Sequence, residues 1–132
     1  MVQQVAPEES VTRELAVYRD RATATAVAEK VRAQAAQCHQ LPASSDGDAM
    51  DVTLEGRADG GDGRLTTGFA ETLTGGQPGG SIFVFTQVGR AVLAVEDSGE
   101  WTRDSAVDGV RSLERADRGV VARLCVFTDA GC

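Results

Sequence analysis

The sequence contains one histidine, one tryptophan, one tyrosine and three cysteines among 132 residues. Because His39 is the single histidine, catalytic designs that need two imidazoles are excluded. None of the cysteines belongs to a Cys-x-x-Cys pair, which argues against a structural zinc site and a thioredoxin-like motif. No apolar run approaches the roughly 18 residues of a transmembrane helix. These absences name no reaction, and we expect a protein that is not an enzyme and holds no metal or cofactor.

Acidic residues outnumber basic ones, with 20 Asp and Glu against 13 Lys and Arg, giving a net charge of −7. This balance argues against a nucleic-acid backbone or an anionic membrane as the main partner. The composition is 42% hydrophobic and 25% charged, as in ordinary globular domains, and the length suits one domain. We therefore expect a single domain over residues 11–132, preceded by a flexible segment over residues 1–10.

Hydrophobic periodicity predicts an α+β fold. Apolar residues at spacings of three and four predict a helix over 21–38, which Asp20 can cap, and a second over 103–124. Because the strands run consecutively between the two helices, we expect an antiparallel sheet of about five strands with both helices packed on one face. Period-two alternation and short apolar runs place these strands at residues 11–18, 51–58, 64–74, 81–88 and 91–95.

Several details refine this pattern. The nearly continuous apolar run SIFVFTQV at 81–88 is typical of a central strand that is covered on both faces. Glu71 falls on the apolar face of its strand, which places it at an edge or breaks the pattern. Gly109 and Gly119 each cost about 1 kcal/mol in a helix interior, so the segment around Asp117 is a candidate break. The tail, CVFTDAGC, is expected to add a short strand.

The three cysteines leave several pairings open. Cys38 lies on the apolar stripe of the first helix and Cys125 just past the second, so a bridge between them is possible. Cys132 is an alternative partner for either, and in a cytosolic protein all three would be reduced thiols. The first residues, MVQQVAPEES, contain neither region of a secretory signal. This start fits a cytosolic protein or one whose leader has been removed.

Three weaker motifs are better explained by ordinary structure. The Asp-Gly segments at 46–48 and 59–63 resemble fragments of calcium loops but lack the closing glutamate, so turn chemistry accounts for them. GGQPGG at 75–80 lacks the Lys-Ser/Thr of a phosphate-binding loop and joins two strands. His39 directly follows Cys38, and adjacent helical residues do not face each other, so we interpret it as an exposed residue at a helix end.

The order of features resembles a known family. The segments that carry the resemblance are AVYRDRATATAVAEKVRAQAAQC, FVFTQVGRAVLAV and RLCVFTDAGC. Over residues 12–132 the sequence is similar to actinobacterial extracytoplasmic sensor domains related to the C-terminal domain of the protein kinase PknH, found also as lone lipoproteins. The resemblance implies an α+β fold, disulfides, export and ligand sensing across a cleft. The sequence departs from that pattern in having three cysteines instead of two disulfides, and in lacking a leader or lipobox.

Three hypotheses follow. The first is a non-enzymatic, extracytoplasmic ligand-sensing domain of an actinobacterial lipoprotein or envelope protein, which binds a small molecule or a cell-envelope component. The second is a cytosolic protein-interaction module, possibly a homodimer through the central strands. The third is a small enzyme that uses Cys125 or Cys132 with His39. For the first, we expect arginines to bind an anionic group and aromatic rings to form apolar walls, and the candidates are Trp101, Arg13, Arg90 and Tyr18.

Overall fold

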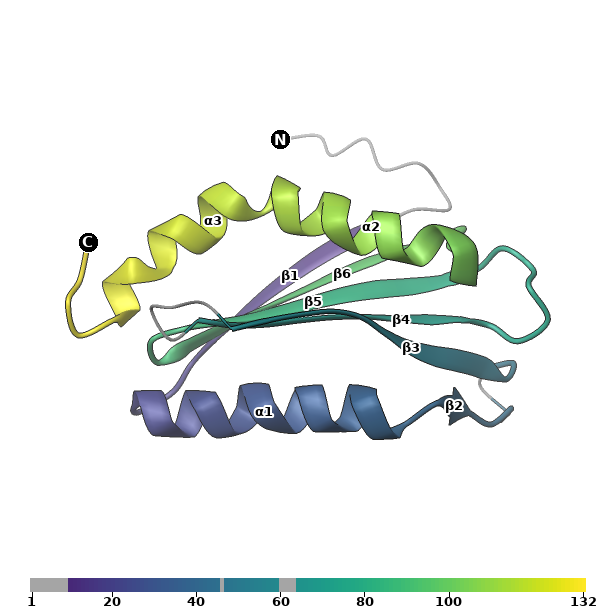
Figure 1. The fold of residues 1–132 in the computed structure, drawn as a ribbon, viewed down its shortest axis with the longest axis horizontal. Helices are drawn as coiled ribbons and strands as arrows, with labels where there is room; N and C mark the ends of the chain where they lie inside the picture. The colour runs from purple at the N-terminus through teal and green to yellow at the C-terminus, as the bar shows by residue number, and fades with distance from the viewer. Residues whose placement is uncertain (1–9, 46, 60–63) are drawn as a thin grey trace.

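The computed structural model describes residues 10–45, 47–59 and 64–132, which form a six-stranded antiparallel sheet with helices on both sides (Figure 1). The strand order across the sheet is β1-β6-β5-β4-β3-β2. This arrangement confirms the α+β class and the antiparallel sheet. The elements in chain order are β1 Ser10–Val17, α1 Arg21–Gln37, β2 Gln40–Leu41, β3 Met50–Asp59, β4 Leu65–Leu73, β5 Gly80–Val88, β6 Ala91–Gly99, α2 Arg103–Ala116, α3 Arg118–Arg123 and the 3-10 helix η1 Leu124–Phe127.

Two predicted hairpins, β3–β4 and β5–β6, are present in the sheet. β5 and β6 are joined at Gly89, whose φ of 58° is readily adopted only by glycine, and the carbonyl of Phe127 occupies the place of a Cβ. β3 and β4 pair along their whole length, which confirms the predicted hairpin although its turn at 60–63 lies outside the described residues. The sixth strand, absent from the sequence prediction, is the two-residue β2 at the edge beside β3.

The helices lie on opposite faces of the sheet, and the prediction that both share one face is wrong. Arg32 of α1 donates a hydrogen bond to Thr67, whereas Val110 of α2 fills the space above Gly68. Consecutive residues of a strand point to opposite faces, so α1 and α2 must lie on different sides. The apolar run of β5 gives the physical reason, because a strand with apolar residues on both faces needs a cover on each.

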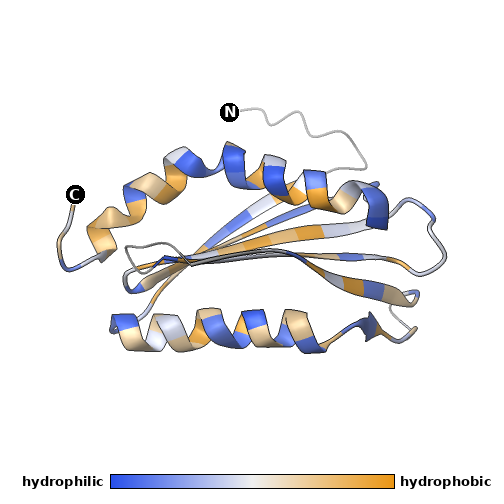
Figure 2. Cartoon of the chain, in the orientation of Figure 1, coloured by the Kyte–Doolittle hydropathy of each residue, from blue (hydrophilic) through white to orange (hydrophobic). Residues whose placement is uncertain are grey.

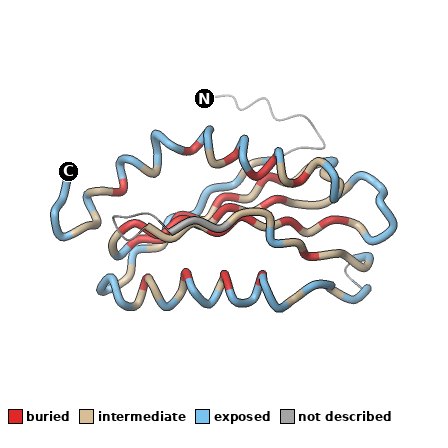
Figure 3. Tube along the Cα trace, in the orientation of Figure 1, coloured by how far each residue is buried: buried red, intermediate tan, exposed pale blue. Residues whose placement is uncertain are grey.

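The face beneath α2 holds the main hydrophobic core. On α2 itself, the hydrophobic and buried residues lie along the side toward the sheet (Figures 2 and 3). Gly68 lets the helix approach, since an added Cβ would collide with the side chain of Val110. Gly109 lies against the ring of Trp101 and the end of Ile82, so close packing offsets its intrinsic cost in a helix. The buried members of this core are Ala70, Ile82, Val84, Val88, Leu93, Val95, Ala106, Val110, Leu113 and Leu124.

The face beneath α1 has smaller and more polar contacts. The helix presents Ala24, Ala28 and Ala35 to the sheet, and these small side chains allow a close approach. Buried Arg32 donates to Thr67 Oγ1 at 3.2 Å and to the Thr66 carbonyl at 3.0 Å. α1 is therefore held to the sheet partly by hydrogen bonds between buried polar groups.

The helix boundaries agree with the sequence analysis except at the C-terminus. Asp20 caps α1 by accepting a hydrogen bond from the Thr23 amide at 2.7 Å, and Thr102 caps α2. The second predicted helix is interrupted at Asp117, as expected, and continues as α3. The predicted strand in the tail is wrong: Leu124–Phe127 is a 3-10 helix followed by a turn. Within the described ranges, no helix is long and apolar enough to cross a membrane.

The position of the central strands also corrects the dimer hypothesis in one respect. β4, β5 and β6 are each paired on both sides within the chain, so their backbone groups cannot join a second copy. Any dimer built by strand pairing would have to use β1, β2 or the part of β3 beyond Asp51, which the two-residue β2 leaves unpaired. On β1, Leu15 and Val17 are both exposed, so the apolar side of this edge strand is only partly covered.

Candidate functional site: an arginine cleft beside the helix break

A cleft of about 300 Å³ lies where α2 and α3 meet above the sheet. Its floor is made of side chains from β5 and β6, and its wall comes from the last turns of α2 and from α3. The break at Asp117 ends α2 over the sheet. We call this site the arginine cleft; it is lined by Arg64, Thr66, Val84, Thr86, Leu93, Val95, Arg111, Glu114, Arg115, Asp117, Arg118 and Val121.

Four arginines surround the apolar floor of the arginine cleft. Arg111, Arg115 and Arg118 follow one another at spacings of four and three residues across the α2–α3 break, and Arg64 approaches from the start of β4. In a chain with a net charge of −7, this is a local reversal of charge. Guanidinium groups carry a fixed charge and match carboxylate or phosphate oxygens in pairs. The cleft therefore combines anion-binding groups with an apolar surface, as small-molecule sites commonly do.

Two carboxylates, Glu114 and Asp117, also line the arginine cleft. Burial raises the pKa of Glu114, and the neighbouring charges of Arg111 and Arg118 partly oppose that rise. Asp117 is buried, and its Oδ1 accepts a hydrogen bond from Arg13 Nε at 2.8 Å. This ion pair connects β1 to the helix break and holds the cleft wall against the sheet edge.

The structure separates the four ligand-binding residues proposed from the sequence. Trp101 follows β6 at one end of the sheet, and Arg90 immediately precedes the same strand at the other, roughly 30 Å away for a nine-residue strand. Trp101 packs into the core against Gly109. Arg13 lies between these ends and contacts the cleft through Asp117.

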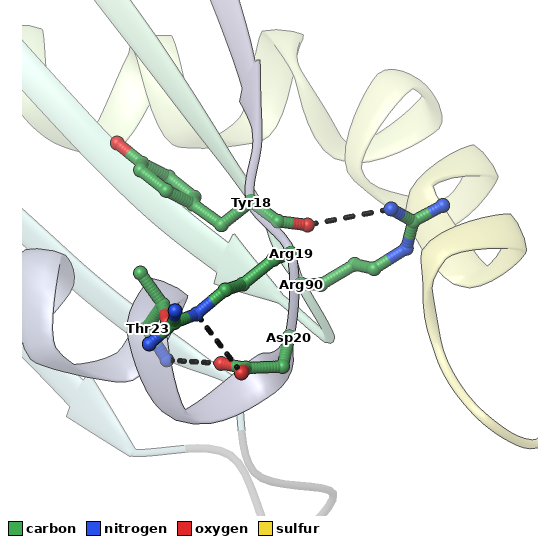
Figure 4. A network of polar contacts seen from close by, with 5 residues as sticks. All are labelled: Tyr18, Arg19, Asp20, Thr23 and Arg90. Atoms are coloured by element: carbon green, nitrogen blue, oxygen red, sulfur yellow. Dashed lines mark hydrogen bonds and ion pairs between the residues drawn. The ribbon is translucent and has the colours of Figure 1, made fainter.

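Tyr18 and Arg90 are brought together, as Figure 4 shows. The Arg90 guanidinium donates to the Tyr18 carbonyl at 3.3 Å, and the Tyr18 amide donates to the Arg90 carbonyl at 2.8 Å. Arg90 also lies over the ring of Phe127, 5.7 Å from its centre. These contacts join the β5–β6 turn to the residue that follows β1 and to the C-terminal segment, which is a structural role for Tyr18 and Arg90. A role in binding a ligand stays a prediction for Tyr18, Arg90, Trp101 and Arg13.

The cysteines resolve into one of the pairings that the sequence left open. Cys125 and Cys132 form a disulfide with their Cα atoms 5.1 Å apart, and Cys38 is a free thiol. In this state neither bonded sulfur is available to His39 as a nucleophile. His39 is exposed after the end of α1, as interpreted from the sequence. Among the described residues, no three His, Cys, Asp or Glu side chains gather closely enough to hold a metal ion.

Sequence reasoning missed the residues of the arginine cleft. Their signal was the helical spacing of Arg111, Glu114, Arg115 and Arg118, a charged stripe beside the apolar one. Such stripes are usually solvated helix faces. The stripe lies at the mouth of a cleft only because α2 packs on β3, β4 and β5 and ends at the break, which leaves part of β5 and β6 as the cleft floor.

The fold is a small α+β domain with an open cleft beside its sheet. No family model and no curated protein matches the sequence. Among solved structures, the extracellular domain of PknH from Mycobacterium tuberculosis has a similar fold, with a TM-score of 0.50 and 14% sequence identity. The match covers 80% of this chain and 57% of that one. The resemblance found in the sequence is thus confirmed as a distant similarity of fold.

Proposed function

We propose that this domain is an extracytoplasmic sensing module that binds a small anionic molecule with an apolar body in the arginine cleft. The observation that carries the proposal is the convergence of four arginines on an apolar floor in an otherwise acidic chain. The anion would pair with guanidinium groups at the rim while its apolar part covers Val84, Leu93 and Val95.

The fold similarity supports sensing outside the cytoplasm, because the neighbour is an extracellular domain. The Cys125–Cys132 disulfide supports the same location, since such bonds persist in oxidising compartments. We place the domain, as part of this proposal, in an actinobacterial lipoprotein or envelope protein, acting by binding and not by catalysis.

The location can be tested separately from binding. Protein made under oxidising conditions is alkylated without reduction, and its intact mass and linked peptides are measured. One bridged pair, Cys125–Cys132, and one alkylated thiol, Cys38, is the expected result. Three alkylated cysteines would favour the alternative of a cytosolic interaction module.

Binding can be tested with octyl phosphate as the probe, followed by the backbone amide shifts of the protein in NMR spectra. We expect shifts at Val84, Leu93 and Val121 with octyl phosphate but not with octyltrimethylammonium. The double variant Arg111→Gln/Arg118→Gln should weaken binding by about tenfold or more, because each charge-assisted hydrogen bond contributes roughly 1.5–3 kcal/mol.

The matched control is Arg103→Gln/Arg123→Gln, which removes the same charge from exposed positions of α2 and α3 outside the cleft. This control should bind octyl phosphate almost as well as the unmodified protein. Equal loss in both double variants would mean that overall charge, and not the cleft, attracts the anion. That result would reject the proposal.

A further inference from the structure

The face of the sheet opposite the arginine cleft is only partly covered. α1 packs on β3, β4, β5 and β6, whereas Thr12 and Glu14 of the edge strand β1 are exposed on that face. Cross-strand register shows which side chains share the uncovered part, because directly paired residues point to the same face. We call this area the acidic corner; its members are Thr12, Glu14, Glu71, Ser81, Phe83, Glu96 and Ser98.

Three carboxylates of the acidic corner come from three different strands. Glu14 lies on β1, Glu96 on β6 and Glu71 on β4, and none of the seven residues is basic. Burial raises the pKa of Glu71, and the charge of Glu96 raises it further. The two carboxylates therefore repel each other across the face, and a cation between them would relieve that repulsion.

Serine hydroxyls hold one of these carboxylates in place. Ser98 Oγ donates to Glu96 Oε1 at 3.1 Å, and the hydroxyls of Ser98 and Ser81 are 2.8 Å apart. Ser81 is paired directly with Glu71 on the next strand. The hydrogen bonds hold the Glu96 carboxylate, and the strand register places Glu71 next to Ser81 on the same face.

An aromatic ring lies among the carboxylates. Phe83 is half-buried and stacks on Phe69 of β4, with ring centres 4.7 Å apart. Its other neighbour, on the β6 side, is Glu96, to which it is directly paired. A hollow of about 160 Å³ beside it is lined by Phe83, Phe85, Glu14 and Glu96, among others. An ammonium or guanidinium group over such a ring gains both cation–π and ionic attraction.

From this arrangement we infer that the acidic corner docks a basic peptide segment of a partner protein. Charge complementarity selects a cation, and the spacing selects a ligand with several of them. β1 and β4 are separated by three strand spacings, about 14 Å, which is too far for one small cation to neutralise all three carboxylates. An extended segment with several Lys or Arg residues can span that distance and place one side chain over Phe83. This inference is independent of the arginine cleft, which lies on the other face.

The test uses a fluorescein-labelled nonapeptide of alternating arginine and glycine, with binding to the full chain measured by fluorescence anisotropy. The unmodified protein should bind the peptide, and binding should weaken as salt is added. Glu71→Gln/Glu96→Gln should reduce the affinity by about tenfold, because it removes two of the three carboxylates that pair with the peptide. Phe83→Leu, which keeps an apolar side chain, should reduce it by a smaller factor.

The matched control is Glu29→Gln/Asp108→Asn, which removes two charges from exposed positions on α1 and α2. Circular dichroism of each variant establishes that the fold is retained. Equal loss of binding in the control would show attraction by net charge alone and would overturn the inference. Absence of binding, or equally tight binding of spermine, would also overturn it. Concentration-dependent self-association that Glu71→Gln/Glu96→Gln abolishes would assign the acidic corner to a second copy instead.

Discussion

The two faces of the sheet are covered by helices of opposite character. Beneath α2, branched apolar side chains from β5 and β6 pack with Val110 and Leu113. Gly68 has no side chain, so the helix can lie close to the sheet. Beneath α1, alanines approach the sheet, and buried Arg32 and Gln87 form hydrogen bonds between helix and strands. One cover relies on apolar area and shape, and the other on small residues and on hydrogen bonds from buried polar side chains.

This difference places both candidate binding sites. On the α2 face, the helix break at Asp117 leaves an opening over apolar strands, so the arginine cleft combines charge with a hydrophobic floor. On the α1 face, one narrow helix leaves β1 and part of its neighbours uncovered, so the acidic corner is open and largely polar. Each site is a consequence of how far the covering helix extends.

The largest expected effect on stability comes from a cavity in the core beneath α2. Ile82 is fully buried there, and Ile82→Ala should lower the free energy of unfolding by about 2–5 kcal/mol, because it leaves a cavity in a packed core. Urea denaturation followed by circular dichroism measures the change. Leu54→Ala on the other face is the control, since Leu54 is 38% exposed and should cost less than about 1 kcal/mol. Similar losses in both variants would show that the two faces are not different in kind.

A second prediction tests the polar attachment of α1. Arg32→Ala removes a buried guanidinium that donates to Thr67 Oγ1 and to the Thr66 carbonyl. We expect a loss of about 1.5–3 kcal/mol in the free energy of unfolding, the usual contribution of hydrogen bonds from a charged group. Exposed Arg21 on the same helix provides the control, and Arg21→Ala should have little effect in the same urea titration. A neutral Arg32→Ala would mean that the alanine stripe alone holds α1.

Much of the fold was predictable because local signals were strong. The β5–β6 hairpin, the Asp20 cap and the break near Asp117 all follow from residues whose conformational preferences are local. The placement of the helices was not, although the apolar run of β5 already indicated two covered faces. Strand order and the side to which a connection crosses depend on contacts between distant segments, which periodicity does not encode.

The candidate sites were less predictable than the fold. Arg111, Arg115 and Arg118 form a stripe that looks like any solvated helix face until β5 and β6 are known to form the floor of a cleft beside it. Glu71 was noticeable, since it breaks the apolar face of its strand. Its partner Glu96 carried no such signal, because the two meet only through the pairing of β4, β5 and β6.

The smallest expected effect concerns Glu71 and the open part of the α1 face. Burial and the charge of Glu96 raise its pKa, so the folded chain binds this proton more tightly than the unfolded chain does. Stability contributed by the protonated form is therefore lost as pH rises above the ordinary glutamate pKa.

Glu71→Gln should raise the melting temperature slightly at pH 7 and leave it unchanged well below the ordinary glutamate pKa, measured by thermal scans at both pH values. Glu29→Gln, an exposed helical variant, controls for the loss of one charge. A gain of the same size at both pH values would trace the effect to packing. A gain confined to pH 7 would show that the ionised carboxylate of Glu71, half-buried and close to Glu96, lowers the stability of the folded chain.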